Sequence, residues 1–308
     1  MVVSTAESTR HRRSLSISAR TNIFGWSFVA PFALVFIAFL AAPLAYAFWL
    51  SLNTRTLTKG VVFTGLDNYA RAFTDEAFLS GVLWVVGFSA VLIPVQMLVS
   101  LAAALVIDAL ATKLASFSRL MIFIPYAIPV VIGALMWGFL YSPRFGPIAE
   151  IAAIFNIDAP YLLDPQWVFF GLMNIVTWQW AGYYMIIIYA ALRGIDPAVY
   201  EAAKIDGANA WQIALRIKVP MISSAMVLIL VFALIGTLQF FTEPQVLRAI
   251  AQGSIDASFT PNMYAFSLAF SYDQINYASA ISFALGLFVV IGSYLFMFFT
   301  RKKSGLNS

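Results

Sequence analysis

The sequence predicts an all-α integral membrane protein with six transmembrane helices, and three observations support this fold class. Of the 308 residues, 62% are hydrophobic and only 10% are charged, whereas soluble domains carry about a quarter charged residues. Mean hydropathy is +0.87. Six stretches contain no Asp, Glu, Lys or Arg, and each is at least 24 residues long: 21–54, 77–107, 120–143, 165–192, 219–242 and 274–300. Because roughly 20 residues of helix cross a bilayer core about 30 Å thick, every stretch is long enough to span it.

These stretches divide the chain into segments. The first apolar run is about twice as long as a signal-peptide core of about 7–15 residues, so we expect this helix to be retained. Prolines inside several stretches indicate a packed bundle with kinked helices. The predicted organisation is a basic tail 1–22, a first transmembrane helix 23–51, an outer loop 52–76, a core 77–300 with five transmembrane helices, and a tail 301–308.

The distribution of basic residues predicts the orientation. Lys and Arg accumulate in short cytoplasmic connections. Six spans place both tails on one side, and that side holds thirteen of the 18 Lys and Arg residues against five on the other. We therefore expect both the N and C termini to be cytoplasmic. The net charge of +4 then reflects membrane topology and lipid headgroups, and we expect no nucleic-acid partner.

Composition excludes several classes of site. The chain has no cysteine and a single histidine, His11, in the basic tail, so thiolate sites and His-based triads or metal clusters are excluded. No G-x-x-x-x-G-K-[ST] phosphate loop occurs. The six stretches carry no ionisable side chain, and such side chains mark ion-coupled transporters. We therefore predict no catalytic residue, no metal site and no ion coupling.

One connection, 193–219, has an architecture of its own. Asp196 is a favourable N-cap and Pro197 occupies the first helical position, where a missing N–H costs nothing. The first helix is expected to end near Asp206, and Gly207 follows where a chain leaving a helix adopts a left-handed conformation.

A second short helix is predicted directly after this turn. Asn209 is expected to cap it, with Gln212 completing a capping box, and Pro220 marks entry into the fifth span. The knob between the two helices would expose carboxylates and small residues, which suit a partner's arginines or amides. An ordinary amphipathic connector is the alternative interpretation.

Here the sequence resembles a known family. The segments that carry the resemblance are Glu201-Ala202-Ala203, Asp206-Gly207-Ala208, Ile217 and Pro220, with Gly65-Leu66-Asp67-Asn68-Tyr69 and Ile124-Pro125-Tyr126 elsewhere. The loop is similar to the EAA loop of permease subunits of ATP-binding cassette (ABC) importers. Within these, it resembles the carbohydrate-uptake branch of the MalF and UgpA types. The chain departs from the branch at 251–260, where a Gly-rich stretch is usual.

The resemblance implies a type I ABC importer permease fold in the bacterial cytoplasmic (inner) membrane. The chain would be the transmembrane permease subunit of an ATP-driven, binding-protein-dependent sugar importer and would form half of the translocation pathway. Its implied partners are a second homologous permease, as a heterodimer, a cytoplasmic ATPase dimer that uses ATP-Mg, and an extracytoplasmic solute-binding protein. The chain itself would hold no cofactor and would not be an enzyme. The residues implied to couple to the ATPase are Glu201, Ala202, Ala203, Asp206 and Gly207.

The substrate pathway is expected among polar and aromatic side chains within spans, because a sugar offers hydroxyls to amides and ring faces to aromatics. The candidates are Asn174, Thr177, Trp178 and Gln179 in the fourth span, which also carries Trp180, Tyr183 and Tyr184, with Gln96 in the second span and Gln239 in the fifth. The alternative roles are anchoring at the membrane interface and hydrogen bonding between helices.

Other functions stay open at this point. The same architecture would serve glycerol-3-phosphate or another polyol or phosphodiester, although a phosphate is expected to meet basic residues, and no span carries one. An integral-membrane enzyme would need its acids from the loops, where the carboxylates show no characteristic spacing. A scaffold protein gives no reason for the pattern from Glu201 to Pro220.

Overall fold

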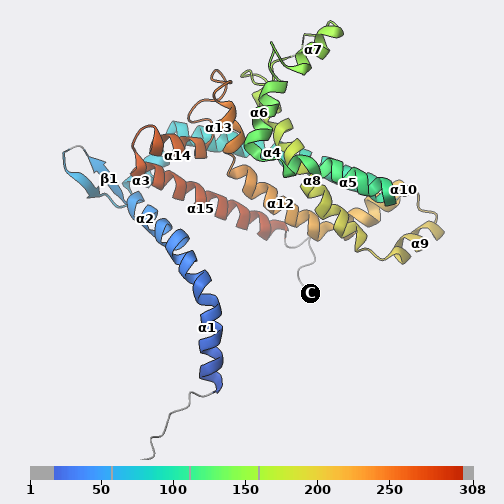
Figure 1. The fold of residues 1–308 in the computed structure, drawn as a ribbon, viewed down its shortest axis with the longest axis horizontal. Helices are drawn as coiled ribbons and strands as arrows, with labels where there is room; N and C mark the ends of the chain where they lie inside the picture. Colours follow the sequence, from blue (N-terminus) through green and yellow to red (C-terminus); the bar gives the residue numbers. More distant parts are fainter. Residues whose placement is uncertain (1–16, 57, 111, 159, 301–308) are drawn as a thin grey trace, which may run out of the picture. The chain divides into compact units, whose positions relative to one another are not determined.

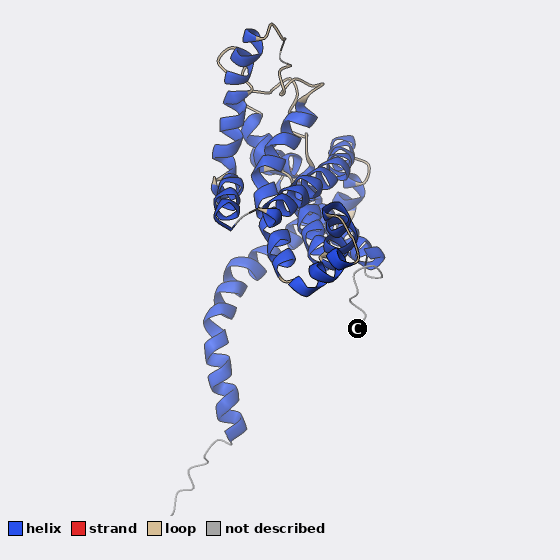
Figure 2. Cartoon of the chain, turned by 90° about the vertical axis from the view of Figure 1, so that its right-hand side faces the viewer, coloured by secondary structure: helices blue, strands red, loops and turns tan. Residues whose placement is uncertain are grey.

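The computed structural model describes residues 17–56, 58–110, 112–158 and 160–300, and nearly all of their regular structure is helical (Figures 1 and 2). The chain forms two compact units, Met1–Leu50 and Ser51–Ser308, which are taken separately below. Most of the predicted basic tail, with His11, and the whole of the tail 301–308 lie outside the described residues.

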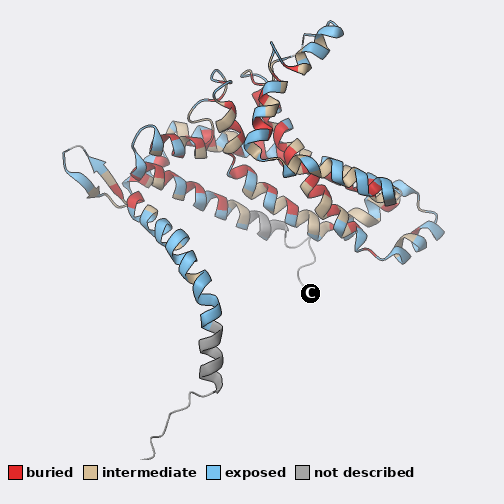
Figure 3. Ribbon diagram, viewed as in Figure 1, coloured by how far each residue is buried: buried red, intermediate tan, exposed pale blue. Residues whose placement is uncertain are grey.

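The described residues of the first unit form one long helix. Its parts are α1 (Ile17–Phe36), the π-helical turn η1 (Ile37–Ala41) and α2 (Ala42–Ser51). The N–H of Ala42 donates to the carbonyl of Ile37, and the wide turn precedes Pro43, which has no N–H to donate. From Trp26 to Ser51 the helix is apolar on every face, and its most apolar window has no buried residue (Figure 3). The helix is long and apolar enough to cross a membrane, as expected for the first transmembrane helix.

A small hairpin and a short helix begin the second unit. Strands β1 (Asn53–Thr56) and β2 (Gly60–Phe63) pair antiparallel, with Asn53 opposite Phe63, and α3 (Asp67–Ala72) follows. The buried amide of Asn68 donates to the carbonyls of Ser51, at 3.0 Å, and Asn53, at 2.9 Å. The Gly65–Tyr69 segment, which the sequence analysis singled out, thus holds the loop together.

The helical bundle makes up most of the second unit. Its long helices are α4 (Glu76–Ala109), α5 (Thr112–Ala127), α6 (Val130–Leu140), α8 (Val168–Arg193), α12 (Ser223–Leu238) and α15 (Ile275–Thr300). The shorter elements are α7 (Pro147–Ile154), α9 (Pro197–Ile205), α10 (Ala210–Ile213), the π-helical η2 (Ala214–Lys218), α11 (Val219–Met221), α13 (Thr242–Leu247) and α14 (Pro261–Phe270).

Helix α8 packs between α4 and α5 at close range. A Cβ added at Gly182 would lie 2.0 Å from the carbonyl oxygen of Ile122 on α5, so only glycine permits this approach. On the other side, the Ser100 hydroxyl on α4 donates to the Ala181 carbonyl at 3.0 Å. Polar side chains thus bond to the backbone of a neighbouring helix, as is common inside membranes.

The third predicted span is not a single helix. Five described helices are long and apolar enough to cross a membrane, and a sixth span is a pair, Lys113–Ala127 and Val130–Leu140, bent by 96°. The expectation of one helix across 120–143 is therefore corrected. Pro129 has extended backbone at the start of α6, because its ring cannot continue a helix without a lost hydrogen bond and a clash.

Candidate functional site

The loop between α8 and α12 folds as its sequence predicts. The carboxylate of Asp196 accepts a hydrogen bond from the N–H of Ala198 at 2.9 Å, and Pro197 opens α9. Beyond α9, Gly207 has φ +80°, a left-handed conformation that glycine adopts without strain. The predicted first helix and its turn are confirmed.

The second helix also starts as predicted. Gln212 N–H donates to the Asn209 side chain, and Asn209 N–H donates to the Gln212 side chain, both at 2.9 Å. This reciprocal pair is a complete capping box. The helix continues through α10, η2 and α11 towards α12, so the loop is a regular structure with a capped start to each of its helices.

Four of the five predicted ATPase-coupling residues lie on the surface of this loop. Glu201, Ala202, Asp206 and Gly207 are exposed, whereas Ala203 is buried against the rest of the unit. Two large apolar side chains lie beside them, with Ile205 86% and Trp211 72% exposed. The sequence analysis did not select these two residues, although an apolar Ile and Trp in a charged loop were a usable signal.

A cavity of about 460 Å³ lies among α4, α8, α12 and the segment from Gln239 to Glu243. Its aromatic wall includes Tyr126, which stacks on Tyr183 with ring centroids 4.6 Å apart and meets Trp180 edge-on at 5.4 Å. Among the described residues that line it there is no lysine or arginine.

The cavity contains two of the predicted pathway residues. Gln96 and Gln239 both line it, and the buried Gln96 amide also donates to the Val176 carbonyl at 3.2 Å. The other predicted pathway residues, Asn174, Thr177, Trp178 and Gln179, do not line this cavity.

Three of these side chains make contacts with neighbouring helices instead. The Gln179 amide donates to the carbonyls of Pro125, at 3.0 Å, and Ile128, at 2.7 Å, at the break between α5 and α6. Asn174 donates to the Tyr141 hydroxyl at 2.7 Å. Trp178 packs edge-on against Trp137 with centroids 5.7 Å apart. The Thr177 hydroxyl is buried without a hydrogen-bond partner in the structure.

Glu243 was missed by the sequence analysis. It lies one residue beyond the charge-free stretch 219–242, yet the apolar segment Ser223–Leu247 includes it, and its side chain is buried at the cavity wall. The expectation that the spans contain no ionisable side chain is therefore wrong at this position. Glu243 lies in the first turn of α13, where the helix dipole favours a carboxylate.

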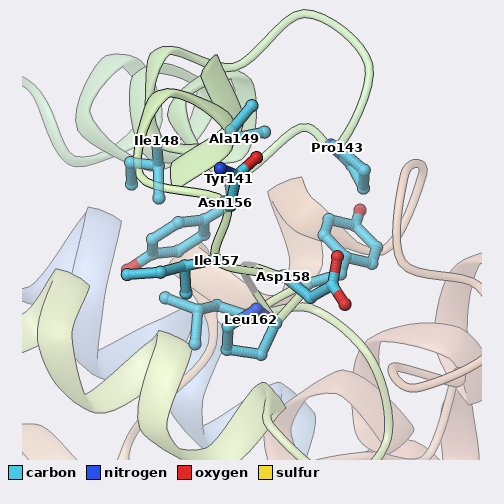
Figure 4. A pocket seen from close by; sticks show the side chains of 11 residues that line it. Tyr141, Pro143, Ile148, Ala149, Asn156, Ile157, Asp158 and Leu162 are labelled. Atoms are coloured by element: carbon cyan, nitrogen blue, oxygen red, sulfur yellow. The ribbon is translucent and has the colours of Figure 1, made fainter. Parts of the chain in front are cut away.

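A second cavity, of about 440 Å³, lies in the segment 141–162 (Figure 4). Its lining residues all come from this segment, and they include Tyr141, Asp158 and Tyr161. Burial raises the pKa of Tyr141 to about 12, although the hydrogen bond from Asn174 opposes the shift. The phenol is therefore neutral at physiological pH, and it donates to the Gly171 carbonyl at 3.2 Å.

Chemistry at a metal is not supported within the described part of the chain, which contains no group of three or more His, Cys, Asp or Glu side chains arranged to hold an ion.

The bundle of apolar helices is that of a multi-pass membrane protein. Residues 96–302 match the family described as the binding-protein-dependent transport system inner membrane component, and the chain belongs to that family. It is thus a multi-pass protein of the inner membrane.

Curated relatives cover almost the whole chain. The lactose transport system permease protein LacF of Rhizobium radiobacter is 29% identical over 293 residues, 94% of this chain and 97% of that protein. The diacetylchitobiose uptake system permease protein NgcF of Streptomyces coelicolor is 26% identical over 314 residues, 97% of this chain and 88% of that protein. A crystal structure of a bacterial alginate ABC transporter contains a chain that matches this fold with a TM-score of 0.78 and 21% identity, over 94% of this chain and 97% of that one.

Proposed function

We propose that this chain is one permease subunit of an ATP-driven sugar importer, and that the loop 193–219 couples it to a separate cytoplasmic ATPase. The observation that carries the proposal is the double-capped loop, which presents Glu201, Asp206, Ile205 and Trp211 outward. Exposed tryptophan surrounded by polar groups is typical of the centre of a protein–protein interface. Because both helices of the loop are capped at their first residues, the loop would move together with the bound ATPase as one body.

The proposed orientation follows from the coupling role. An ATPase in the cytoplasm requires the loop 193–219 on that side, and six spans then place both termini there. The excess of Lys and Arg on the same side supports this arrangement. A homologous second permease would supply the other half of the pathway, and a solute-binding protein would deliver the substrate from the opposite side.

A sugar is the substrate that the cavity supports best. Aromatic faces such as Tyr183 and Trp180 suit sugar rings, while Gln96 and Gln239 offer amides to hydroxyls. The relatives named for lactose and diacetylchitobiose point to the same class. Glycerol-3-phosphate or another anionic substrate is disfavoured, because the described lining holds the carboxylate of Glu243 and no basic side chain.

Uptake by cells that express the whole transporter tests this function. The substrates are radiolabelled lactose, diacetylchitobiose and glycerol-3-phosphate, each offered alone in a strain from which this chain has been deleted and then restored. We expect restoration to recover ATP-dependent uptake of at least one of the two sugars and not of glycerol-3-phosphate. Recovery of glycerol-3-phosphate uptake alone would contradict the assignment to sugars.

A further inference from the structure

A largely shielded, part-buried ion pair joins the last turn of α4 to the loop. The ammonium Nζ of Lys218, at the end of η2, lies 2.5 Å from Oδ2 of Asp108, and the two side chains are only 16% and 9% exposed. These residues are 110 positions apart in the chain. The pair therefore connects two elements that the sequence does not place together.

Helix α9 meets the same ammonium. Nζ of Lys218 lies 5.0 Å from the centre of the Tyr200 ring, within the range of a cation–π contact. Tyr200 belongs to α9, and its hydroxyl is buried without a hydrogen-bond partner in the structure. Burial, and then the charge of Asp108, raise the pKa of this phenol against the opposing effect of Arg193. Three elements, α4, α9 and η2, thus converge on one positive charge.

A purely structural role explains this arrangement poorly. The other ion pair within the described residues, Arg55 with Asp273, has side chains 65% and 82% exposed, and pairs of that kind contribute little. A buried pair costs desolvation on both sides, and apolar side chains of similar size would often stabilise the fold as well. What the charged pair adds is a fixed relative position for the groups that it joins.

Helix α4 leads from this pair to the cavity. Gln96 and Leu92 on α4 line the cavity wall. Gln96 precedes Asp108 by twelve positions, or about 18 Å of helix at about 1.5 Å per residue. Apolar contacts surround the connection, because Ile107 belongs to the same core cluster as Ile195 and Val199 of the loop. A displacement of α9 is therefore in a position to be passed to α4 as a unit.

We propose that Asp108, Lys218 and Tyr200 form a joint that transmits movement of α9 to α4 and hence to the cavity. This inference rests on the proposed coupling function. The three are positioning residues, because none of them lines the cavity. Loss of the joint should leave ATP hydrolysis in place while reducing the sugar transported for each ATP consumed.

The test measures transport and ATP hydrolysis together in proteoliposomes that contain the whole transporter with its solute-binding protein, using the sugar identified by the uptake assay. For Asp108→Asn and Lys218→Met we expect the ratio of sugar transported to ATP hydrolysed to fall about fivefold or more, the range of typical coupling energies. The reversed pair, Asp108→Lys with Lys218→Asp, should recover part of the ratio through the restored ion pair, although it removes the ammonium from the Tyr200 ring. Tyr200→Leu should lower it, and Tyr200→Phe, which keeps the ring, should not.

Matched controls separate the joint from folding and from the proposed function. Arg55→Met and Asp273→Asn alter the exposed pair and should leave the ratio unchanged. If Asp108→Asn does not reach the membrane, the reversed pair and Tyr200→Leu carry the test. An unchanged ratio in Asp108→Asn, or in Tyr200→Leu where Asp108→Asn does not fold, overturns the joint. A reversed pair that folds but recovers nothing also overturns it. Glu201→Lys in the same assay separates the joint from the proposed coupling function. If Glu201→Lys loses transport while the joint variants do not, the coupling function holds and the joint is refuted. If Glu201→Lys keeps transport, the coupling function is refuted.

Discussion

Replacement of Gln179 by leucine tests the account of the bent third span. At the break between α5 and α6, the Gln179 amide donates to the carbonyls of Pro125 and Ile128 at 3.0 and 2.7 Å. The Pro125 carbonyl also accepts from the Ile128 N–H, so the Ile128 carbonyl depends most on Gln179. Leucine fills a similar volume but donates nothing. Gln179→Leu therefore leaves the part-buried Ile128 carbonyl unpaired, whereas the Pro125 carbonyl keeps the hydrogen bond from the Ile128 N–H at 3.2 Å.

The expected magnitude follows from these two bonds. A buried group left without its partner costs about 1–3 kcal/mol, and this upper range applies to the single carbonyl of Ile128. Two effects reduce this cost. Gln179 Oε1 is itself buried without a partner, so its removal relieves a penalty, and hydrogen bonds between membrane helices average only about 0.6 kcal/mol. We expect a net loss of about 0.5–2 kcal/mol in the free energy of unfolding.

Denaturant titration in detergent micelles, followed by circular dichroism, measures this loss. Gln179→Glu serves as the matched variant, because a carboxylate has the same shape and no donor, so it should be at least as destabilising. Gln239→Leu removes an exposed amide and should change stability by less than about 0.5 kcal/mol. If Gln179→Leu were as stable as Gln239→Leu, the claim that Gln179 holds the break would be wrong.

Two further predictions concern packing and pH. Gly182→Ala would bring a Cβ 2.0 Å from the Ile122 carbonyl, so we expect about 1–3 kcal/mol of destabilisation in the same titration. The control Gly87→Ala, where an added Cβ meets nothing within 4 Å, should be neutral or stabilising. Equal stability of the two variants would refute the close approach of α8 to α5. Burial alone would raise the pKa of Asp75, but hydrogen bonds from Tyr277, Tyr264 and the N–H groups of Phe78 and Ala77 outweigh it and lower the pKa below 3.8. The stability that Asp75 contributes is therefore fully present above about pH 3.8 and lost as pH falls through the lowered pKa. Asp75→Asn should show a smaller loss of thermal stability than the unmodified protein over that acid range, and parallel losses would contradict this role.

Local features of the fold could be predicted from the sequence because their causes are local. Asp196 with Pro197, Gly207, and the pair Asn209 and Gln212 each act within a few residues, so the loop folds as expected whatever surrounds it. The span lengths follow in the same way from runs of apolar residues.

The bend in the third span depends on contacts that lie far apart in sequence. Residues 120–143 form an unbroken apolar run, and Pro129 alone is compatible with a mild kink or a sharp break. Gln179, 51 positions beyond Ile128, satisfies the carbonyl that the break frees. A pattern within the span does not contain this information.

Most of the predicted pathway residues lie on a face of α8 that does not line the cavity. Helical spacing groups Asn174, Thr177 and Trp178, and the structure places Asn174 and Trp178 against Tyr141 and Trp137. The cavity is lined instead by the neighbouring face of α8, which carries Val176, Trp180, Tyr183 and Tyr184. Both faces are polar and aromatic, so only the packing of α8 against its neighbours decides which of them meets the cavity.

Binding of the ATPase to the loop tests the central claim most directly. The transporter is expressed with a tagged nucleotide-binding subunit, and the amount of this chain that co-purifies from detergent is measured for Glu201→Lys and for Glu150→Lys, a charge reversal at an exposed residue of α7. We predict that Glu201→Lys reaches the membrane in normal amount but loses the ATPase, whereas Glu150→Lys retains it. Equal retention of the ATPase by both variants, together with unchanged ATP-driven uptake, would contradict the account.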